Sequence, residues 1–148
     1  MADQFTRRAL SVLLGLNRPT YTLWPAQTGV PATGTTLTPG VGAWGAYANI
    51  IAALAITTEF WLCHVEFDTS AGVHGLREVQ IYNATLLVAL FGTRFDMLVV
   101  GAAGLGAYPP VPFPMPCYCN ANTQVQGRVG AAAAAQTINA SLLVATGL

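Results

Sequence analysis

The C-terminal stretch from Tyr108 to Leu148 reads YPPVPFPMPCYCNANTQVQGRVGAAAAAQTINASLLVATGL. A run of prolines opens it, and two segments in which polar and apolar residues alternate follow, at 122–129 and 137–146. Alternation with a period of two is typical of β-strands, because successive side chains point to opposite faces. Proline donates no hydrogen bond to a sheet, so residues 109–116 are expected at a sheet edge or leading into a strand. The stretch therefore predicts an extended lead-in, a strand, a turn and a closing strand.

Similar patterns occur upstream. In Thr57–Asp68 the alternation predicts a strand with Trp61, Cys63, Val65 and Phe67 on one face. Leu76–Tyr82 repeats the pattern, with the apolar side chains of Val79 and Ile81 on a single face. Tyr21–Trp24 is short but also fits a strand.

Two further strands are predicted between these segments and the proline run. Thr85–Phe91 is nearly all apolar, which is typical of a strand that is covered on both faces. Gly92–Arg94 is interpreted as a turn, and Phe95–Val100 as the strand that follows it.

These observations predict an all-β fold, namely a jelly-roll-like antiparallel β-sandwich with an extended N-terminal arm. Six to eight short strands joined by glycine- and proline-rich links favour a sandwich, and eight strands in two sheets would make a jelly roll. Residues 20–45 are rich in Thr, Gly and Pro and read as an ordered loop or arm. We expect an extended arm and loop at 1–43 and the β-sandwich domain at 44–148.

The composition points to a chain that hides much of its surface. Hydrophobic residues make up 53% of the 148 residues and charged residues only 8%, against about 25% in an ordinary globular domain. Either a membrane protein or a subunit packed against other subunits would fit. The apolar run at Ala46–Ile56 is too short for a spanning helix, so we expect no membrane insertion. The net charge is zero and no basic patch is visible, so nucleic acid is not an expected partner.

Aromatic and arginine side chains are the candidates for contacts with a partner, because such residues dominate interface energetics. The tryptophans have an alternative role as covers for an edge of the chain's own core, and the N-terminal arginines as solvated charges. The interface candidates are Trp24, Trp44, Arg7, Arg8, Arg18 and Tyr108.

The sequence offers little for catalysis. His64, Glu66 and Asp68 share a predicted strand face and could form a metal or general-base cluster, but also a solvated outer face. No second cluster supplies a nucleophile or an oxyanion donor, so the outer face is favoured. The glycine-rich segment Gly101–Gly106 lacks the lysine and the spacing of a phosphate loop. We therefore predict a protein that is not an enzyme, with no catalytic residues, no cofactor and no metal.

The three cysteines, Cys63, Cys117 and Cys119, do not match a zinc site in spacing. They are interpreted as buried or half-buried thiols of a protein in a reducing compartment. The N-terminus Met1–Gln4 lacks the basic and apolar regions of a secretory signal.

Three motifs carry a resemblance over about residues 56–148: Phe113–Pro116, Gln124–Val129 and Asn139–Leu143. The first is a proline–apolar–proline entry into a strand, the second a strand with Gln and Arg, and the third a closing Asn-x-Ser-Leu-Leu strand. In this order they resemble a jelly-roll module of virion proteins in tailed bacteriophages. In that family such modules serve as cement or decoration proteins on the capsid, or sit at the neck and tail.

The resemblance implies a structural virion protein, namely a capsid decoration or cement protein. Its expected partners are further copies of itself, in a trimer or dimer, and the major capsid protein. Its expected location is the virion, assembled in the host cytoplasm. The alternative is a phage neck, tail or fibre module. In its carbohydrate-binding form, Trp24, Trp44 or Tyr108 would stack on sugars. A small metal-dependent jelly-roll enzyme is a third hypothesis.

Overall fold

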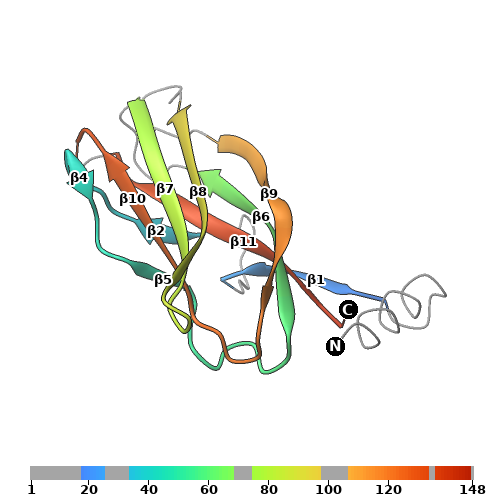
Figure 1. The fold of residues 1–148 in the computed structure, drawn as a ribbon. Helices are drawn as coiled ribbons and strands as arrows, with labels where there is room; N and C mark the ends of the chain where they lie inside the picture. The colour runs from blue at the N-terminus through green and yellow to red at the C-terminus, as the bar shows by residue number, and fades with distance from the viewer. Residues whose placement is uncertain (1–17, 26–33, 69–74, 98–106, 134–135, 148) are drawn as a thin grey trace.

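A computed structural model describes residues 18–25, 34–68, 75–97, 107–133 and 136–147 of the chain. Within these ranges the regular elements are all β-strands (Figure 1). They are β1 Thr20–Trp24, β2 Thr35–Leu37, β3 Gly40–Val41, β4 Ala43–Trp44, β5 Ala48–Ile51, β6 Phe60–Asp68, β7 Gly75–Asn83, β8 Val88–Met97, β9 Ala107–Cys119, β10 Val125–Ala131 and β11 Ile138–Thr146. No helix in this described part of the chain is long and apolar enough to span a membrane.

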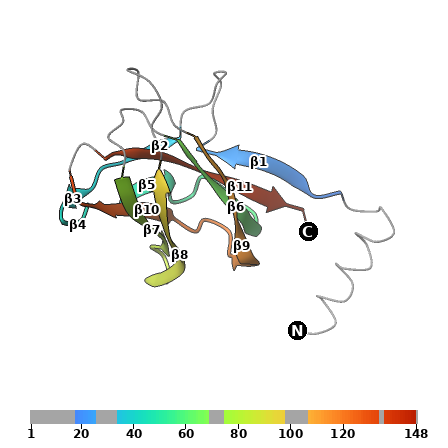
Figure 2. The same cartoon turned by 90° about the horizontal axis from the view of Figure 1, so that it is seen from above.

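The strands form two sheets that face each other as two layers (Figure 2). The first sheet has the order β1-β11-β6-β9, and β2 also pairs with β11. The second sheet has the order β4-β3-β10-β7-β8, and β5 also pairs with β10. β1 and β2 pair with successive parts of β11, so together they occupy one strand position beside it. In the same way, β3 and β5 together occupy one strand position beside β10.

The pairing is that of one long hairpin rolled around itself. Four antiparallel pairs are nested along the chain, β1 with β11, β5 with β10, β6 with β9 and β7 with β8. Successive pairs alternate between the first and the second sheet, and β6 and β7 also join β11 and β10 respectively. Eight strand positions in two such sheets make a jelly roll. The predicted all-β, jelly-roll-like sandwich is confirmed.

The predicted arm and loop at 1–43 includes β1, β2 and β3 and the first residue of β4, and these strands take part in both sheets. Thr20–Trp24 pairs with residues 142–146 of β11, and Thr35–Leu37 with residues 138–140. The strands β2 to β4 are two or three residues long, too short to show a period in sequence. An arm formed by residues 1–17 remains a prediction, because these residues lie outside the described ranges.

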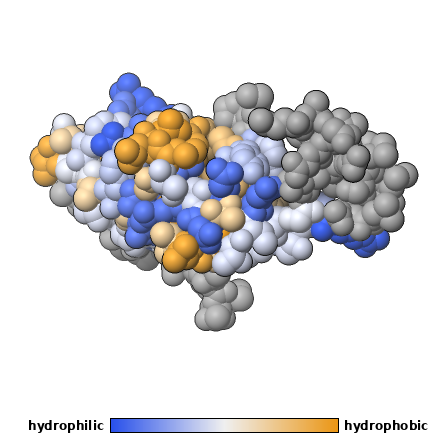
Figure 3. All heavy atoms as spheres, turned by 60° about the horizontal axis from the view of Figure 1, so that its bottom comes forward, coloured by the Kyte–Doolittle hydropathy of each residue, from blue (hydrophilic) through white to orange (hydrophobic). Residues whose placement is uncertain are grey.

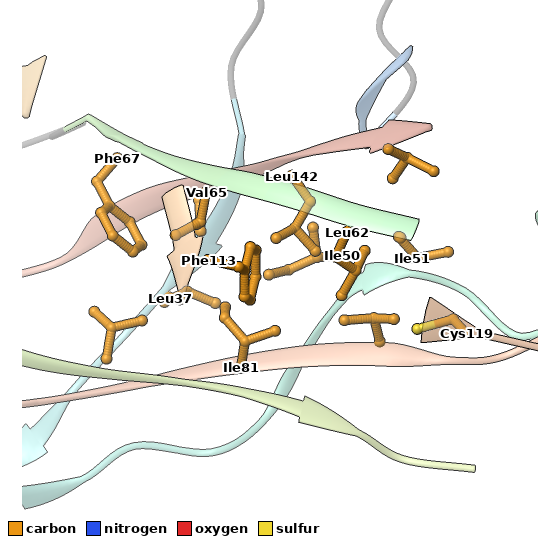
Figure 4. Close-up of a cluster of buried hydrophobic side chains, with 14 of the residues drawn as sticks. Leu37, Ile50, Ile51, Leu62, Val65, Phe67, Ile81, Phe113, Cys119 and Leu142 are labelled. Atoms are coloured by element: carbon orange, nitrogen blue, oxygen red, sulfur yellow. The ribbon is translucent and has the colours of Figure 1, made fainter. Parts of the chain in front are cut away.

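The core lies between the sheets (Figure 4). Figure 4 shows Val65 and Leu142 of the first sheet pointing toward Ile81 of the second, with the Phe113 ring between the layers. The inward positions predicted for the last two strands are confirmed, since Val125, Val129, Ile138, Ala140, Leu142 and Val144 are all fully buried. Asn139 and Ser141, predicted to face outward on the last strand, are buried as well, so β11 is covered on both faces over most of its length.

The face assignment within β6 is wrong for its first half. Leu62 is fully buried and Trp61 only half-buried, the reverse of the predicted pattern. A β-bulge causes the change, because Leu143 pairs with His64 but the next residue of β11, Val144, pairs with Leu62. The extra residue, Cys63, reverses the phase of the alternation, so Val65 and Phe67 point inward as predicted.

The predicted turn at Gly92–Arg94 is also wrong. These residues pair with Gln80, Val79 and Glu78 inside one continuous strand, β8. The chain turns earlier, at residues 84–87, just before β8. The predicted strand Thr85–Phe91 therefore begins in a turn, and most of its side chains are exposed rather than covered on both faces. Residues 98–100 of the last predicted strand lie outside the described ranges.

The proline-rich segment forms β9, the edge strand of the first sheet. This confirms the expectation from the missing N–H donors. The register against β6 shifts twice, so β9 follows its neighbour irregularly.

One charged side chain, Arg77, lies on the inner face of β7 and is fully buried. Its Nη1 donates a hydrogen bond to the carbonyl oxygen of Gly75. Burial lowers the pKa of the guanidinium, and the nearby carboxylate of Asp96 opposes that shift.

Candidate functional site

A cluster of aromatic, amide and arginine side chains covers part of the outer face of the second sheet. The alternation in β7 and β10 turns Gln80, Tyr82 and Arg128 away from the core. Trp44, the last residue of β4, and Tyr47, just before β5, come over them from the neighbouring strands. We call these five residues the aromatic–arginine cluster.

Arg128 lies at the centre of this cluster. Its guanidinium carbon is 4.7 Å from the centroid of the Trp44 ring and 4.6 Å from that of Tyr47. Its Nε donates a 2.8 Å hydrogen bond to Oε1 of Gln80, and the Tyr47 hydroxyl donates to the same oxygen at 3.0 Å. The Tyr47 ring also packs on Tyr82, with the ring centroids 4.9 Å apart. The cation is thus held in one orientation on the surface of the sheet.

Among the described residues, no carboxylate forms an ion pair with Arg128. The acid nearest along the sheet, Glu78, instead pairs with Arg94, whose Nε lies 3.6 Å from Glu78 Oε1. The positive charge of Arg128 is therefore compensated by ring faces and an amide oxygen. A charge held in this way can accept an acidic or aromatic group from a partner.

A shallow hollow of about 300 Å³ lies beside the cluster. Small residues make up most of its lining, namely Gly42, Ala43, Gly130, Ala131 and Ala132. A Cβ at Gly130 would come within 3.4 Å of the Trp44 ring. The walls of the hollow include Trp44, Leu76 and Glu78. The Trp44 side chain is 40% exposed, so it remains accessible to a partner.

The described residues among the predicted interface candidates lie in different parts of the structure and do not form one site. Trp44 belongs to the aromatic–arginine cluster, whereas Trp24 is half-buried and packs against the core, which is the alternative role considered for it. Arg18 is exposed, just before β1. The backbone of Tyr108 pairs with Phe67, and its side chain is not described. Arg7 and Arg8 lie outside the described residues.

Sequence reasoning missed Tyr47, Gln80 and Arg128 as parts of one site. Alternation did place Gln80 and Arg128 on outward faces, so the signal for exposure was present. Their proximity depends on the pairing of Arg128 with Gln80 across β10 and β7, which a single strand pattern does not contain.

The second candidate group, His64, Glu66 and Asp68, lies on the outer face of the first sheet. Nε2 of His64 is 3.0 Å from Oε1 of Glu66, whereas Oδ1 of Asp68 accepts a hydrogen bond from Asn139. In the described ranges no group of three or more His, Cys, Asp or Glu side chains is placed to hold a metal ion.

The three cysteines are free thiols, and burial raises the pKa of each. The pKa of Cys119 rises to about 12 through burial, with a smaller contribution from Cys117. Such thiols stay protonated at neutral pH, so they are poor nucleophiles and poor metal ligands.

The stacking of Arg128 on Trp44 can be measured with a double-mutant cycle. We expect Trp44→Ala and Arg128→Ala to show a coupling free energy of about 0.5–1 kcal/mol in urea unfolding, as for partly exposed cation–π pairs. Arg94→Ala, which changes an exposed cation of the same sheet face, is the matched control and should not couple to Trp44→Ala. A coupling energy of zero for the first pair would mean that the ring contact does not stabilise the protein.

Neither a protein-family model nor a curated protein sequence matches the chain. Among solved structures it is similar to the infectious bursal disease virus VP2 subviral particle, with 17% identity and a TM-score of 0.36 over 86% of this chain. A structure of the Gt strain of the same virus gives 15% identity and a TM-score of 0.40 over 88% of this chain. In both cases the match covers 32% of the other chain, so this chain spans about a third of their length.

Proposed function

We propose that the chain is a non-catalytic structural protein of a virion, which forms a homo-oligomer and binds the major capsid protein shell as a decoration or cement protein. One observation carries the proposal: a jelly roll with few charges exposes many large apolar side chains. They are Tyr21, Val41, Trp44, Tyr47, Leu54, Leu76, Leu86, Leu87, Val88 and Tyr118. Where such side chains gather, as Trp44 and Tyr47 do and as Leu86, Leu87 and Val88 do, they are typical of contacts with other proteins.

The aromatic–arginine cluster is the part of this surface best suited to the shell. Trp, Tyr and Arg are the residues that most often dominate interface energies. Trp44 and Tyr47 already hold Arg128 in place, so binding orders few further rotamers there. A carboxylate of the shell protein would complete the charge balance of Arg128.

Cosedimentation of the purified chain with empty capsid shells of its virus tests the proposal. We expect saturable binding, and density for the chain on the shell in a low-resolution electron microscopy image. Trp44→Ala should weaken binding about tenfold or more, as expected for a central tryptophan anchor. Trp61→Ala, on the outer face of the other sheet, is the matched control and should bind like the unmodified chain.

The absence of any binding to shells, necks or tails in such preparations would refute the proposed virion role. Density at the neck or tail, rather than on the shell, would favour the alternative of a neck, tail or fibre module.

The hollow beside Trp44 favours carbohydrate binding as a second candidate function. An exposed indole next to a carboxylate, here Trp44 and Glu78, can stack on a sugar and accept its hydroxyl hydrogen bonds. A glycan array separates the two functions. Glycan binding that Trp44→Ala abolishes would support the carbohydrate module, and a blank array would remove it.

A further inference from the structure

One end of the sandwich carries an apolar surface outside the aromatic–arginine cluster. Leu54, in the β5–β6 loop, is 69% exposed, and in the β7–β8 turn Leu86 is 60% and Leu87 75% exposed. Val88, the first residue of β8, adds to them. We call these four residues the apolar tip. Figure 3 looks toward this end of the molecule and shows hydrophobic surface on it.

Hydrogen bonds hold the β7–β8 part of the tip in place. Oδ1 of Asn83 accepts from the backbone N–H of Thr85 at 3.0 Å and from that of Leu86 at 2.9 Å. The N–H of Ala84 donates to the carbonyl oxygen of Gln124, whose own N–H donates to the Thr85 hydroxyl, both at 3.0 Å. The leucines therefore stand on a fixed turn.

The β5–β6 loop joins the same network from the other side. The N–H of Leu54 donates to the carbonyl oxygen of Asn122 at 3.5 Å, and the N–H of Asn122 donates to that of Ile56 at 2.7 Å. The loop at 120–124 thus connects both parts of the tip.

Two leucines of the tip have backbones that disfavour leucine. Leu54 has a φ of 65° and Leu87 a φ of 57°, both in the left-handed region. Asparagine or glycine would be more stable there, and either would also be more soluble in an exposed turn. A large apolar side chain that is both strained and exposed indicates a contact that benefits from it.

The lack of exposed charge at this end favours a second copy of the chain as the binding partner. The three loops at this end are 52–59, 84–87 and 120–124, and none of their exposed residues is Asp, Glu, Lys, Arg or His. Their one charged residue, Glu59, is half-buried and lies directly before β6. Around a rotation axis each residue meets its own counterpart, so any charge near the axis would face a like charge. An apolar and rigid end whose exposed loop residues are uncharged satisfies this condition, whereas a surface evolved for a different partner has no such restriction.

We infer that the apolar tip is the surface through which copies of this chain associate, around a symmetry axis close to Leu87. The inference deepens the proposed function, since it rests on the homo-oligomer named there. Figure 1 places the β7–β8 turn and β4, which carries Trp44, at different ends of the second sheet. Self-association at the tip thus leaves the aromatic–arginine cluster accessible.

Charge substitutions at Leu87 test this contact. By light scattering and sedimentation from about 1 to 100 μM, we expect the unmodified chain to associate and both Leu87→Asp and Leu87→Lys to raise the dissociation constant at least about tenfold. An equimolar mixture of the two variants should associate again, because opposite charges then meet at the axis. Val41→Asp is the matched control, since Val41 is also 75% exposed but is the last residue of β3, outside the apolar tip.

Three results would overturn the inference: an unmodified chain that stays monomeric, association that Leu87→Asp leaves unchanged, or variants that do not recover on mixing. Cosedimentation of a monomeric chain with neutral phosphatidylcholine vesicles, lost in Leu87→Asp, would instead assign the tip to lipid. Association through Leu87 without binding to shells would refute the decoration role alone. Binding of a monomer to shells would refute the tip contact alone.

Discussion

Replacing Gly45 with alanine is expected to destabilise the fold by about 3 kcal/mol or more, a large part of the stability of a domain of this size. A Cβ at this position would lie 1.8 Å from the carbonyl oxygen of Thr38 and 2.9 Å from its carbonyl carbon. Both atoms belong to the backbone, so no side-chain rotation relieves the overlap. The N–H of Gly45 also donates to the carbonyl oxygen of Val129 at 2.9 Å, which ties this crossing to β10.

Urea unfolding of Gly45→Ala measures the loss. Gly92→Ala is the control, because the nearest atom to a Cβ there, the carbonyl oxygen of Val79, is 3.8 Å away. That variant should stay within about 0.5 kcal/mol of the unmodified protein. A loss below about 1 kcal/mol for Gly45→Ala would mean that residues 38 and 45 are not in close contact.

Leu62→Ala is expected to cost about 2–5 kcal/mol, because it opens a cavity at a fully buried position. The substitution tests the bulge at Cys63 directly. If the alternation ran unbroken through β6, Leu62 would share the outward face with His64, and its truncation would cost little.

Urea unfolding measures the loss of stability in Leu62→Ala and in a control variant. Leu76→Ala removes the same atoms from a side chain that is 41% exposed and lies outside the apolar tip, so it should change the stability by less than about 1 kcal/mol. Equal small effects for both variants would show that Leu62 faces solvent and that β6 has no bulge at Cys63.

Much of this fold could be predicted from sequence because polar and apolar residues alternate along its long strands. The alternating segments at 60–68, 75–83, 125–131 and 138–146 are all strands. In β7 and β10 the alternation reflects burial on one face, whereas β11 is buried on both faces over most of its length. The edge position of the prolines followed from the same hydrogen-bond argument.

The errors have physical causes in particular residues. The bulge at Cys63 leaves no trace in composition, since both phases of β6 offer apolar side chains. Gly92–Arg94 has the composition of a turn, whereas the real turn at 84–87 contains neither glycine nor proline and depends on Asn83. Nothing in the sequence distinguishes Asn83, whose side chain caps this turn, from the other asparagines.

The site was predictable in part. Trp44 was a candidate on its residue type alone, and alternation placed Arg128 outward. The contact of both with Tyr47 depends on strands from separate parts of the chain meeting in one sheet, which local pattern does not specify.

The rolled hairpin also constrains how the protein is made. Thr20 of β1 pairs with Thr146 of β11. The first strand described in the chain therefore cannot pair until the last has been synthesised. On a ribosome, β1 to β10 emerge with their apolar faces uncovered until β11 is released. The contact order of such a topology is high, which slows folding and prolongs that exposure. In a chain with so few charges to keep it soluble, we expect the newly synthesised protein to depend on chaperones more than a helical protein of equal length.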